Sequence, residues 1–436
     1  MRTSPSQTSA IECSRRRFVI NAASLSAALG AAGVHAGVAP APTTSPTSRL
    51  GVGFIGAGSR AGAHMTVINW LRTQAKAAVD IVAVCDAWRP RAQAAATNFH
   101  AKAFMDYREL LADPAVDVVC ISTPDHLHGY QIIDAVRAGK HVYCEKPFTH
   151  WRQFELAKKA AQEVAKSGRV FQLGTQGMSD GAWHVARKLI ADGLIGRPIH
   201  VECGYFRVGD WGERGMPIPD RNARPGPDLN WEAFLGDAPK RDFDVSRFFR
   251  WRMYEDYAGG PVTDLFPHTL TPVVSMLGVS FPARVAAIGG IYRYPEREVP
   301  DTFNMLIEYP EKVVVAVLGT QGNNDPGANV RGSGHRCPVI RGWEGSLTFA
   351  GKEVVFTPAA GSKSTPQRFA IPHGEDFSRH WENFLDCCRR GNTNTYSPAQ
   401  LAYHVQTALI MGMISSRTGA ITAFDTAREE IVVRGA

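Results

Sequence analysis

The chain has 436 residues, of which 44% are hydrophobic and 20% are charged, and its net charge is +7. This composition is typical of an ordinary folded globular protein, and the lack of a fixed sequence repeat argues against a solenoid or a propeller. Because a single hydrophobic core stops growing before this length, we expect at least two domains.

The first 36 residues have the features of an export signal. Paired arginines at Arg15 to Arg17 directly precede an Ala-rich apolar run from Phe18 to Val34, and Val34-His35-Ala36 offers small residues for cleavage. This pattern predicts a twin-arginine signal peptide and a periplasmic or otherwise exported protein. The alternative is a membrane anchor, but the run is shorter than the roughly 20 apolar residues of a spanning helix. We therefore expect no stable membrane span after cleavage.

Charge and cysteine content restrict the partners of the mature chain. Loss of the signal would remove four arginines and one glutamate and lower the net charge from +7 to +4. Such a small excess, without a basic run, does not indicate nucleic-acid binding. Seven cysteines would remain with no CxxC pair, and Cys85, Cys120 and Cys144 lie in or at the end of apolar runs. We expect buried thiols and no metal site.

Residues 49–176 alternate apolar strands with amphipathic helices. This alternation specifies the parallel, doubly wound α/β sheet of a Rossmann domain. Strands are expected at 50–55, 80–85, 116–122, 141–144 and 170–173, and helices at 90–99, 128–138 and 151–167, with a first helix ending at Leu71. Ahead of this domain, residues 37–48 are rich in Pro, Ser and Thr, which predicts an extended linker or arm.

Residues 177–436 have a different pattern, in which strands follow one another with little helix between them. The strands are expected at 199–206, 284–290, 304–309 and 313–318. Such runs predict a second α+β domain with a large open mixed or antiparallel sheet. The segment 210–252 is long, aromatic and rich in Pro and Gly, and a long ordered loop of this kind is usually functional.

A GxGxxA pattern lies between the first predicted strand and its helix, at Gly56, Gly58 and Ala61. This is the position of a dinucleotide fingerprint: the first glycine permits a tight turn and the second lets the backbone approach a pyrophosphate. Ser59 and Arg60, at the predicted helix start, are candidate cofactor contacts because unpaired N–H groups there attract phosphate. The alternative is an ordinary Gly-rich turn.

Asp86 stands at the end of the second predicted strand, where a carboxylate can accept hydrogen bonds from both ribose hydroxyls of adenosine. A carboxylate would repel the additional phosphate of NADP, so the sequence favours NAD. Arg60 and Arg89 are close enough in sequence to pair with that phosphate if Asp86 turned aside, which leaves NADP as the alternative.

Two short motifs are candidates for the chemistry. Glu145 and Lys146 end a buried strand, at the edge of an α/β sheet where ligands bind, and Pro147 restricts the lysine to extended geometry. Asp264 and His268 are four residues apart and would share a face at a helix start, where the pair could orient a hydroxyl and remove its proton. The alternatives are a surface ion pair and a helix cap with a structural histidine.

Together these motifs resemble the glucose-fructose oxidoreductase and inositol dehydrogenase family, Gfo/Idh/MocA. The resemblance runs from about Leu50 to the C-terminus, and rests on GAGSRAGAH at 56–64, STPDHLH at 122–128, CEKPFTH at 144–150 and DxxxH at 264–268. The run 230–236 followed by 247–252 is similar to exported bacterial members. The resemblance implies nicotinamide bound between a Rossmann sheet and an open second sheet, in homodimers or homotetramers.

The resemblance also implies roles for the matching residues. Lys146 matches the catalytic lysine, Asp264 a hydroxyl-orienting carboxylate and His268 the proton acceptor. Cofactor contacts are implied for a further set: Thr123, Pro124, His128, Glu145 and Lys146. The expected function is hydride transfer between a secondary hydroxyl of a sugar, glycoside or polyol and a tightly bound NAD. Tyr205, Trp211 and Trp251 are weaker candidates for stacking on a sugar ring.

Two other functions stay open. Asp264-Leu265-Phe266-Pro267-His268 lacks the glycine of the family's frequent Asp-x-Gly-x-His pattern and is similar to a stretch in NAD-dependent glycosidases of glycoside hydrolase family 109. Such a glycosidase or lyase oxidises C3 transiently and leaves the cofactor unchanged. A nonenzymatic sugar-binding relative is the other alternative, against which the filled Lys146, Asp264 and His268 positions argue. By similarity to glucose-fructose oxidoreductase, the arm 37–48 would cover the adenosine of a neighbouring subunit.

Overall fold

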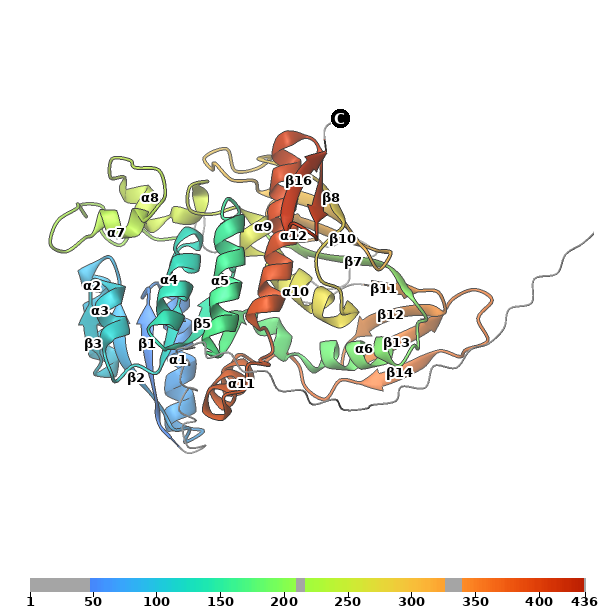
Figure 1. The fold of residues 1–436 in the computed structure, drawn as a ribbon, viewed down its shortest axis with the longest axis horizontal. Coiled ribbons are helices and arrows are strands. Elements are labelled where there is room, and N and C mark those ends of the chain that lie inside the picture. Colours follow the sequence, from blue (N-terminus) through green and yellow to red (C-terminus); the bar gives the residue numbers. More distant parts are fainter. Residues whose placement is uncertain (1–47, 209–215, 326–338, 435–436) are drawn as a thin grey trace, which may run out of the picture. The chain divides into compact units, whose positions relative to one another are not determined.

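The computed structural model describes residues 48–208, 216–325 and 339–434, which form two β-sheets flanked by helices (Figure 1). The predicted signal, the arm except for Ser48, and Trp211 lie outside the described residues. Across the described ranges, every helix is too short or too polar to cross a membrane.

The first sheet has six parallel strands in the order β3-β2-β1-β4-β5-β6. Its strands are β1 (Leu50–Ile55), β2 (Val79–Cys85), β3 (Lys102–Phe104), β4 (Val118–Ile121), β5 (His141–Glu145) and β6 (Phe171–Gly174). This is the strand order of a dinucleotide-binding Rossmann sheet, and it confirms the predicted fold class. The chain reverses direction of winding between β1 and β4, which opens a crevice at the carboxyl ends of these strands.

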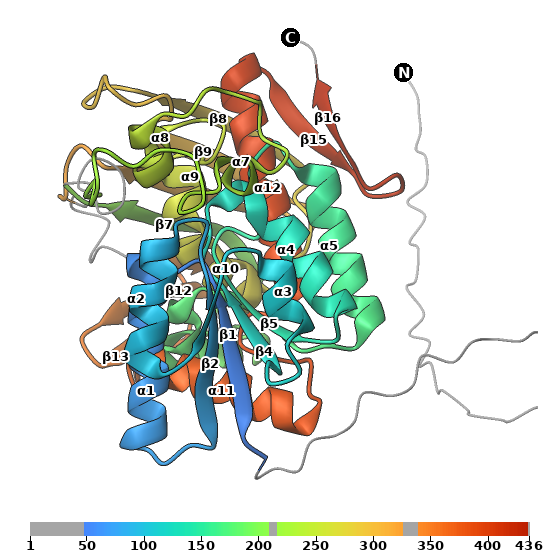
Figure 2. The ribbon, with the colours of Figure 1, turned by 90° about the vertical axis from the view of Figure 1, so that its left-hand side faces the viewer.

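Helices cover both faces of this sheet (Figure 2). They are α1 (Ser59–Thr73), α2 (Arg89–Phe99), α3 (Tyr107–Ala112), α4 (Asp125–Arg137) and α5 (Phe154–Ser167). Buried residues of α1 and α2 share one core with the sheet, and those of α3, α4 and α5 share another. Helix α4 begins at Asp125, directly after Pro124, rather than at His128 as predicted, so that Asp125 lies in its first turn.

The second sheet has ten strands in the order β14-β13-β12-β11-β7-β10-β9-β8-β15-β16. Its strands are β7 (Pro198–Phe206), β8 (Arg284–Gly290), β9 (Thr302–Tyr309), β10 (Val313–Thr320), β11 (Val339–Gly342), β12 (Gly345–Ala350), β13 (Glu353–Pro358), β14 (Gln367–Ala370), β15 (Ile421–Asp425) and β16 (Glu430–Arg434). Strands β7 and β10 are parallel and the other neighbours are antiparallel, which confirms the predicted mixed sheet.

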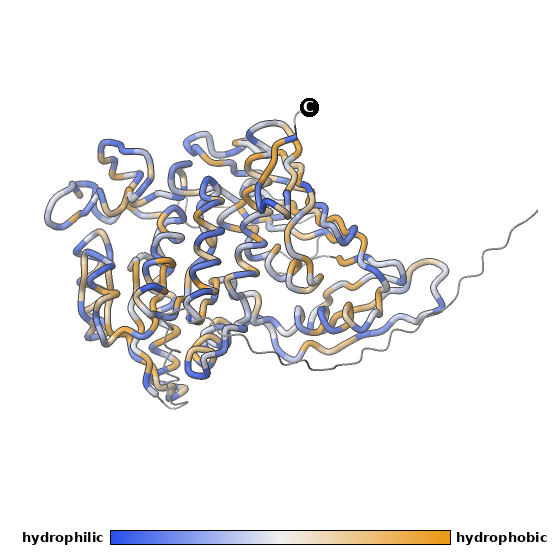
Figure 3. The backbone as a smooth tube through the Cα atoms, in the orientation of Figure 1, coloured by the Kyte–Doolittle hydropathy of each residue, from blue (hydrophilic) through white to orange (hydrophobic). Residues whose placement is uncertain are grey.

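One face of the second sheet is covered by α6 (Gly181–Ala191), α10 (Phe266–Leu277) and α12 (Ala399–Thr418), which share its largest hydrophobic core. Figure 3 shows the hydrophobic character of α12 in orange. Along β9, buried Phe303, Met305 and Ile307 alternate with the more exposed Asn304 and Leu306. Successive residues of a strand point to opposite faces of a sheet, so the face without these helices, which carries Asn304 and Leu306, is in contact with solvent.

Two segments from the C-terminal part of the chain pack on the Rossmann sheet. Helix α11 (Phe377–Arg390) buries Trp381 and Phe384 in the core of β1 and α1, and the Arg389 guanidinium donates to the Ala78 carbonyl at 3.0 Å. The boundary predicted at residue 177 therefore does not separate everything that packs on each sheet, because α11 returns to the nucleotide-binding half.

The second segment, residues 216–258, is named the strap here. It contains α7 (Trp231–Leu235), α8 (Val245–Phe249) and the 3-10 turn η2 (Trp251–Met253). The Asn230 N–H donates to the Ala87 carbonyl at 2.8 Å, and the Arg89 N–H donates to the Asp228 carbonyl at 2.9 Å. The strap is thus hydrogen-bonded to the chain that follows β2, and its own aromatic core packs there.

Candidate active site

The turn after β1 has the geometry that a dinucleotide requires. Gly56 has φ of +90°, and a Cβ atom there would lie 2.7 Å from the Ser122 carbonyl oxygen. A Cβ atom at Gly58, by contrast, would meet nothing within 4 Å, so this glycine faces open space. Helix α1 follows at once with no side-chain cap, which leaves its first N–H groups for a phosphate. The turn fits a pyrophosphate.

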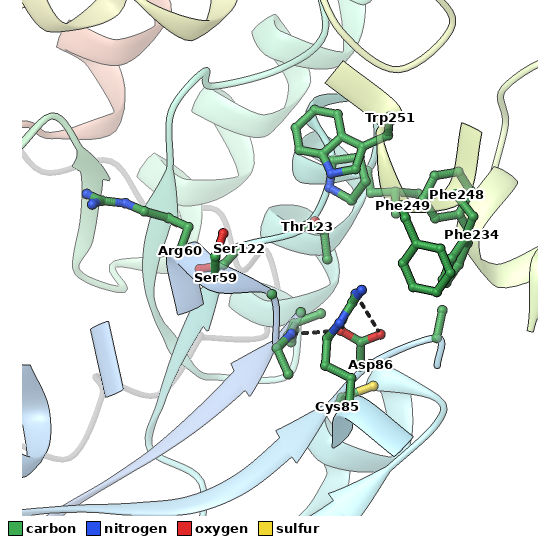
Figure 4. Close-up of a pocket in the computed structure, with 18 of the residues that line it drawn as sticks. Ser59, Arg60, Cys85, Asp86, Ser122, Thr123, Phe234, Phe248, Phe249 and Trp251 are labelled. Atoms are coloured by element: carbon green, nitrogen blue, oxygen red, sulfur yellow. Dashed lines mark hydrogen bonds and ion pairs between the residues drawn. The ribbon is translucent and has the colours of Figure 1, made fainter. Parts of the chain in front are cut away.

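A cavity of about 360 Å³ lies between this turn, the ends of β2 and β4, and the strap (Figure 4). Most of the predicted cofactor contacts line it: Gly56, Gly58, Ser59, Arg60, Asp86, Thr123 and Pro124. The strap contributes a further set that lines the same cavity: Met216, Phe234, Phe248, Phe249, Trp251 and Arg252. A site with polar groups on the Rossmann side and aromatic groups on the strap side suits a nucleotide.

Asp86 is held in one orientation at the floor of this cavity. The Ala57 N–H donates to its Oδ2 and the Trp88 N–H donates to its Oδ1, each at 2.9 Å. The two oxygens have about four lone-pair sites, and beyond the backbone groups they are shared only with the long contacts of Arg91 at 3.3 Å and 3.4 Å, so a ribose hydroxyl would compete with Arg91. Because two backbone groups fix the carboxylate, it does not turn aside for a second phosphate, and the site fits NAD.

Arg60 and Arg89, which the NADP alternative would pair with such a phosphate, have other partners. Arg60 donates through Nε to Glu145 at 2.8 Å and points away from Asp86 (Figure 4), and Arg89 pairs with Asp228 at 2.9 Å. The arginine beside Asp86 is Arg91, whose NH1 lies 3.3 Å and 3.4 Å from the two carboxylate oxygens.

Lys146 and Asp264 form the central ion pair of the site. Lys146 follows β5, Asp264 ends the short helix α9 (Pro261–Asp264), and Lys146 Nζ lies 2.5 Å from Asp264 Oδ1 and donates to the Asp264 carbonyl at 2.8 Å. Burial alone would raise the pKa of Asp264, but Lys146, Arg252 and Arg207 outweigh it and hold that pKa well below its usual range. The carboxylate is therefore ionised whenever the protein is folded near neutral pH.

His268 lies in the first turn of α10, and its side chain is half-buried. The sequence predicted Asp264 and His268 on one face if a helix starts there. Helix α9 ends at Asp264 and α10 starts at Phe266, with Leu265 between them in an α-helical backbone conformation. The proline at position 267 favours the first turn of α10.

Glu145 belongs to a buried network rather than to the cavity lining. Its Oε1 accepts from Arg60 at 2.8 Å and from Gln176 at 2.9 Å. The Trp381 indole, which can only donate, gives its hydrogen to His64 Nδ1 at 2.9 Å, so His64 donates through Nε2 to Glu145 at 2.8 Å. Burial lowers the pKa of His64 to about 4, which keeps this ring neutral. The hydrogen bonds of Glu145 thus hold the end of β5, directly before Lys146, in place.

His128 is buried and does not line the nucleotide cavity, whereas it was expected beside the nicotinamide. Its Nδ1 lies 2.7 Å from the Pro147 carbonyl oxygen and its Nε2 lies 2.9 Å from the Thr123 carbonyl oxygen. The buried ring thus connects the ends of β4 and β5. Burial lowers the pKa of His128, and the hydrogen bonds to the Pro147 and Thr123 carbonyls oppose this shift.

The three aromatic candidates for sugar stacking separate in space. Trp251 lines the nucleotide cavity, with the Arg252 guanidinium 4.2 Å from its ring centroid, so one face of the ring is covered by Arg252. Tyr205 lies on β7, half-buried, with Arg207 at 6.0 Å from its ring centroid. Trp211 lies outside the described residues.

Several residues of the site were not predicted. Arg207 NH2 lies 3.7 Å from Asp264 Oδ2 and Arg252 Nε lies 3.5 Å from Asp264 Oδ1. Asp125, in the quoted STPDHLH motif, is buried, and desolvation raises its pKa to about 7 against the opposing charges of Lys146 and Arg252. Arg252 belongs to the RFFRWR run, but nothing in the sequence indicates that the strap returns to this ion pair.

Comparison with known proteins agrees with the geometry. Residues 50–175 match the family described as "Oxidoreductase family, NAD-binding Rossmann fold" in the Gfo/Idh/MocA group, and residues 181–314 match its C-terminal alpha/beta domain. The chain is 31% identical over 169 residues to scyllo-inositol 2-dehydrogenase (NAD(+)) of Bacillus subtilis, covering 38% of this chain and 45% of that protein.

Inositol 2-dehydrogenase 1 of Saccharopolyspora erythraea is 33% identical over 203 residues, which cover 45% of this chain and 53% of that protein. The chain thus matches about half the length of these curated relatives. A structure of levoglucosan dehydrogenase in complex with NADH and levoglucosan superimposes with a TM-score of 0.63 at 22% identity, over 88% of this chain and 99% of that one. The fold, the fingerprint and both matched segments place this chain in the Gfo/Idh/MocA oxidoreductase family, with an NAD-binding Rossmann domain.

Proposed function

We propose that the protein is an NAD-dependent oxidoreductase that interconverts a secondary hydroxyl and a ketone on a sugar, glycoside or polyol. The observation that carries the proposal is the Lys146–Asp264 pair, at the carboxyl end of β5, beside a cavity that fits a dinucleotide. The names of the curated relatives support this class of substrate, since they act on inositols and on levoglucosan.

NAD held in this cavity would supply the acceptor for the hydride of the carbinol carbon. As the hydroxyl loses its proton, negative charge develops on the oxygen, and the protein must stabilise that charge. Lys146 is suited to this role because its ammonium group is positioned by both the carboxylate and the backbone carbonyl of Asp264. A fixed cation needs no reorganisation when the charge appears.

The proton of the same hydroxyl requires an acceptor. By its match to the family motif, His268 is proposed to take this proton in oxidation and to return it in reduction. Its position at the start of α10, close in sequence to Asp264, is consistent with a place at the same end of the site. The overall reaction moves one hydride to NAD and one proton to the imidazole.

We propose further that NAD is held tightly. The strap closes the cavity with Phe248, Phe249 and Trp251, and these side chains are almost completely buried. Its attachment includes the buried Asp256, which pairs with Arg152, outside the strap, at 3.6 Å. Release of the nucleotide would require this aromatic wall to open.

We propose that the protein is exported. The twin-arginine pattern supports export after folding. Outside the cytoplasm, without a soluble pool of NAD, the enzyme would need to recycle one bound nucleotide.

We also propose that the protein forms a homo-oligomer. The solvent face of the second sheet supports this, because Ile288 and Leu306 are 75% and 53% exposed on neighbouring strands. Exposed apolar groups gathered on one face are a common sign of an interface.

The test is a panel of sugars, glycosides and polyols mixed with purified protein and excess NAD, with reduced cofactor and sugar products both measured. A ketone product with matching NADH supports the proposal. Release of an aglycone with no net change in the cofactor would instead support the glycosidase of the family 109 type, and no product from any compound would contradict both.

A further inference from the structure

Three cationic side chains converge on one carboxylate at the centre of the site. Asp264 Oδ1 lies 2.5 Å from Lys146 Nζ and 3.5 Å from Arg252 Nε, and Asp264 Oδ2 lies 3.7 Å from Arg207 NH2. These side chains come from three different parts of the fold: the end of β5, the strap and the residue after β7. Asp264 is thus an ion-pair partner that Lys146, Arg252 and Arg207 share.

The second carboxyl group nearby adds little negative charge. Asp125 is 4% exposed, in the first turn of α4, and its pKa of about 7 reflects burial that Lys146 and Arg252 only partly oppose. Near neutral pH this group is therefore about half protonated. Glu145, a further carboxylate that acts on Lys146, is paired with Arg60 at 2.8 Å, so Lys146 and Arg252 together carry more positive charge than Asp264 offsets.

Arg252 is the most informative of the three cations. Its guanidinium stacks on the Trp251 ring at 4.2 Å, and its other described contacts are Asp264 and the Met216 sulfur at 3.9 Å. Stacking on an aromatic face holds a guanidinium in place while its N–H groups remain available for a planar anion. Arg252 also lines the nucleotide cavity, so it stands where cofactor and substrate would meet.

We propose that the substrate of this site is a sugar acid, whose carboxylate is bound by Arg252 with help from Arg207 while Lys146 holds the reacting oxygen. This inference rests on the proposed function and narrows it from sugars in general to acidic ones. Arginine and carboxylate match each other in charge and in planar geometry, and a charge-assisted pair inside a partly buried site is strong enough to select the acid over a neutral sugar.

The pyrophosphate of the nucleotide is the other anion that Arg252 could serve. The pyrophosphate belongs at Gly58 and the start of α1, where the first N–H groups of the helix lie. Arg252, in contrast, contacts the same Asp264 oxygen that Lys146 holds, which places it at the hydride-transfer end. The experiment separates these two uses.

The first arm uses the unmodified protein and matched pairs: glucuronate with glucose, galacturonate with galactose, and the neutral methyl ester of glucuronate as a control of similar shape. We expect kcat/KM for the acids to exceed that for the neutral partners by roughly tenfold or more, the range expected for one charge-assisted hydrogen bond. Calorimetric binding of glucuronate and glucose to the NADH-loaded protein measures the same preference without turnover.

The second arm uses Arg252→Gln and Arg252→Lys, with Arg250→Gln as the matched control. Arg250 lies in the same strap and donates through Nε to the Met216 carbonyl at 2.9 Å, so its loss tests whether the strap merely loosens. In Arg252→Gln, the ratio of kcat/KM for the acid to kcat/KM for its neutral partner should fall to about two or less. Arg252→Lys should retain part of the preference for the acid. Arg250→Gln should leave the preference unchanged, and NAD affinity should stay within about threefold in all variants.

The outcomes are distinguishable. If no sugar is oxidised but glucuronate still binds more tightly than glucose in an Arg252-dependent way, the proposed function fails and the acidic specificity stands. Equal kcat/KM and equal binding for acids and neutral sugars overturn the acidic specificity and leave the oxidoreductase. A loss of NAD affinity in Arg252→Gln with an unchanged acid preference also overturns it, because Arg252 would then serve the cofactor phosphates.

Discussion

The ammonium group of Lys146 donates to the Asp264 carbonyl at 2.8 Å and lies 2.5 Å from the carboxylate of the same residue. Two acceptors on one residue fix the direction of the ammonium group as well as its distance. Lys146 is absent from the lining of the nucleotide cavity, so its proposed role in the chemistry can be tested apart from cofactor binding.

Replacement of Lys146 by Met should therefore lower kcat by about 10²-fold to 10⁴-fold, the usual range for loss of a positioned proton donor or charge-stabilising group. NAD affinity should change by no more than about threefold, because the cavity lining is intact. Steady-state kinetics and a cofactor titration on the same preparation measure both values. An unchanged kcat would show that Lys146 is not a catalytic residue.

Replacement of Asp86 by Asn should weaken NAD binding by roughly tenfold to hundredfold, because the ribose hydroxyls lose a charged acceptor. NADP should be affected less, since its phosphate no longer meets a carboxylate and can approach Arg91. The ratio of the two dissociation constants, measured by fluorescence titration, tests the account. Asp228→Asn is the control, because Asp228 pairs with Arg89 at the surface and away from the cavity lining. If the ratio of the NAD and NADP dissociation constants stays the same in Asp86→Asn, Asp86 is not the carboxylate that binds the ribose.

Phe249 is expected to control cofactor release. Its ring lies 5.1 Å from that of Trp88, edge to face, and 5.5 Å from the Arg91 guanidinium, so it joins the strap to the chain beside Asp86. Phe249→Ala should speed NADH release by about tenfold or more, and Phe249→Leu by less, because more of the buried apolar surface remains. The measurement is stopped-flow displacement of NADH by excess NAD.

The control for this prediction is Phe243→Ala. Phe243 packs in the same aromatic cluster, 5.3 Å from Trp231, but it does not line the cavity. If release accelerates equally in both alanine variants, general loosening of the strap explains the effect. If release is unchanged in Phe249→Ala, the strap does not retain the nucleotide.

Burial raises the pKa of Asp125 in the folded protein to about 7, above the usual value of an aspartate in an unfolded chain. The folded state therefore holds more protons than the unfolded state between about pH 4 and pH 7, so this group's contribution to stability falls as the pH rises through that window. The neighbours that set the pKa are Lys146, Arg252, Thr263 and Asp264.

Asp125→Asn removes this titration. The free energy of unfolding of the variant, relative to the unmodified protein, should rise across the window by up to about 1.4 kcal/mol per pH unit and level off above pH 7. Urea denaturation at several pH values gives the difference directly. A difference that does not vary with pH would show that Asp125 is ionised in the folded protein throughout.

The Rossmann half could be predicted closely from the sequence because its signals are local. The strand at Leu50–Ile55 is a continuous apolar run, the fingerprint follows at Gly56, and Asp86 ends the next strand. The short strand Lys102–Phe104 and the helix Tyr107–Ala112 were not predicted, because three and six residues carry too little periodicity to separate them from a loop.

The rest of the site depends on contacts between residues far apart in sequence. Arg252, in the strap, reaches the same Asp264 carboxylate as Lys146, and α11 returns to bury Trp381 beside β1. The division into α9 and α10 on either side of Leu265 could not be read from the DxxxH spacing, which is equally compatible with one continuous helix. Tertiary packing decides these positions, so local patterns did not indicate them.

The most direct test of the central claim is transfer of deuterium from a substrate carbon to the nicotinamide. The purified protein is mixed in a single turnover with NAD and a sugar acid carrying deuterium on its secondary carbinol carbons, and the reduced cofactor is analysed by mass spectrometry. The account predicts reduced NAD that carries one deuterium from the sugar, formed by the unmodified protein and lost in Lys146→Met. Absence of the label from the cofactor with both acidic and neutral deuterated sugars, in protein that binds NAD, would contradict it.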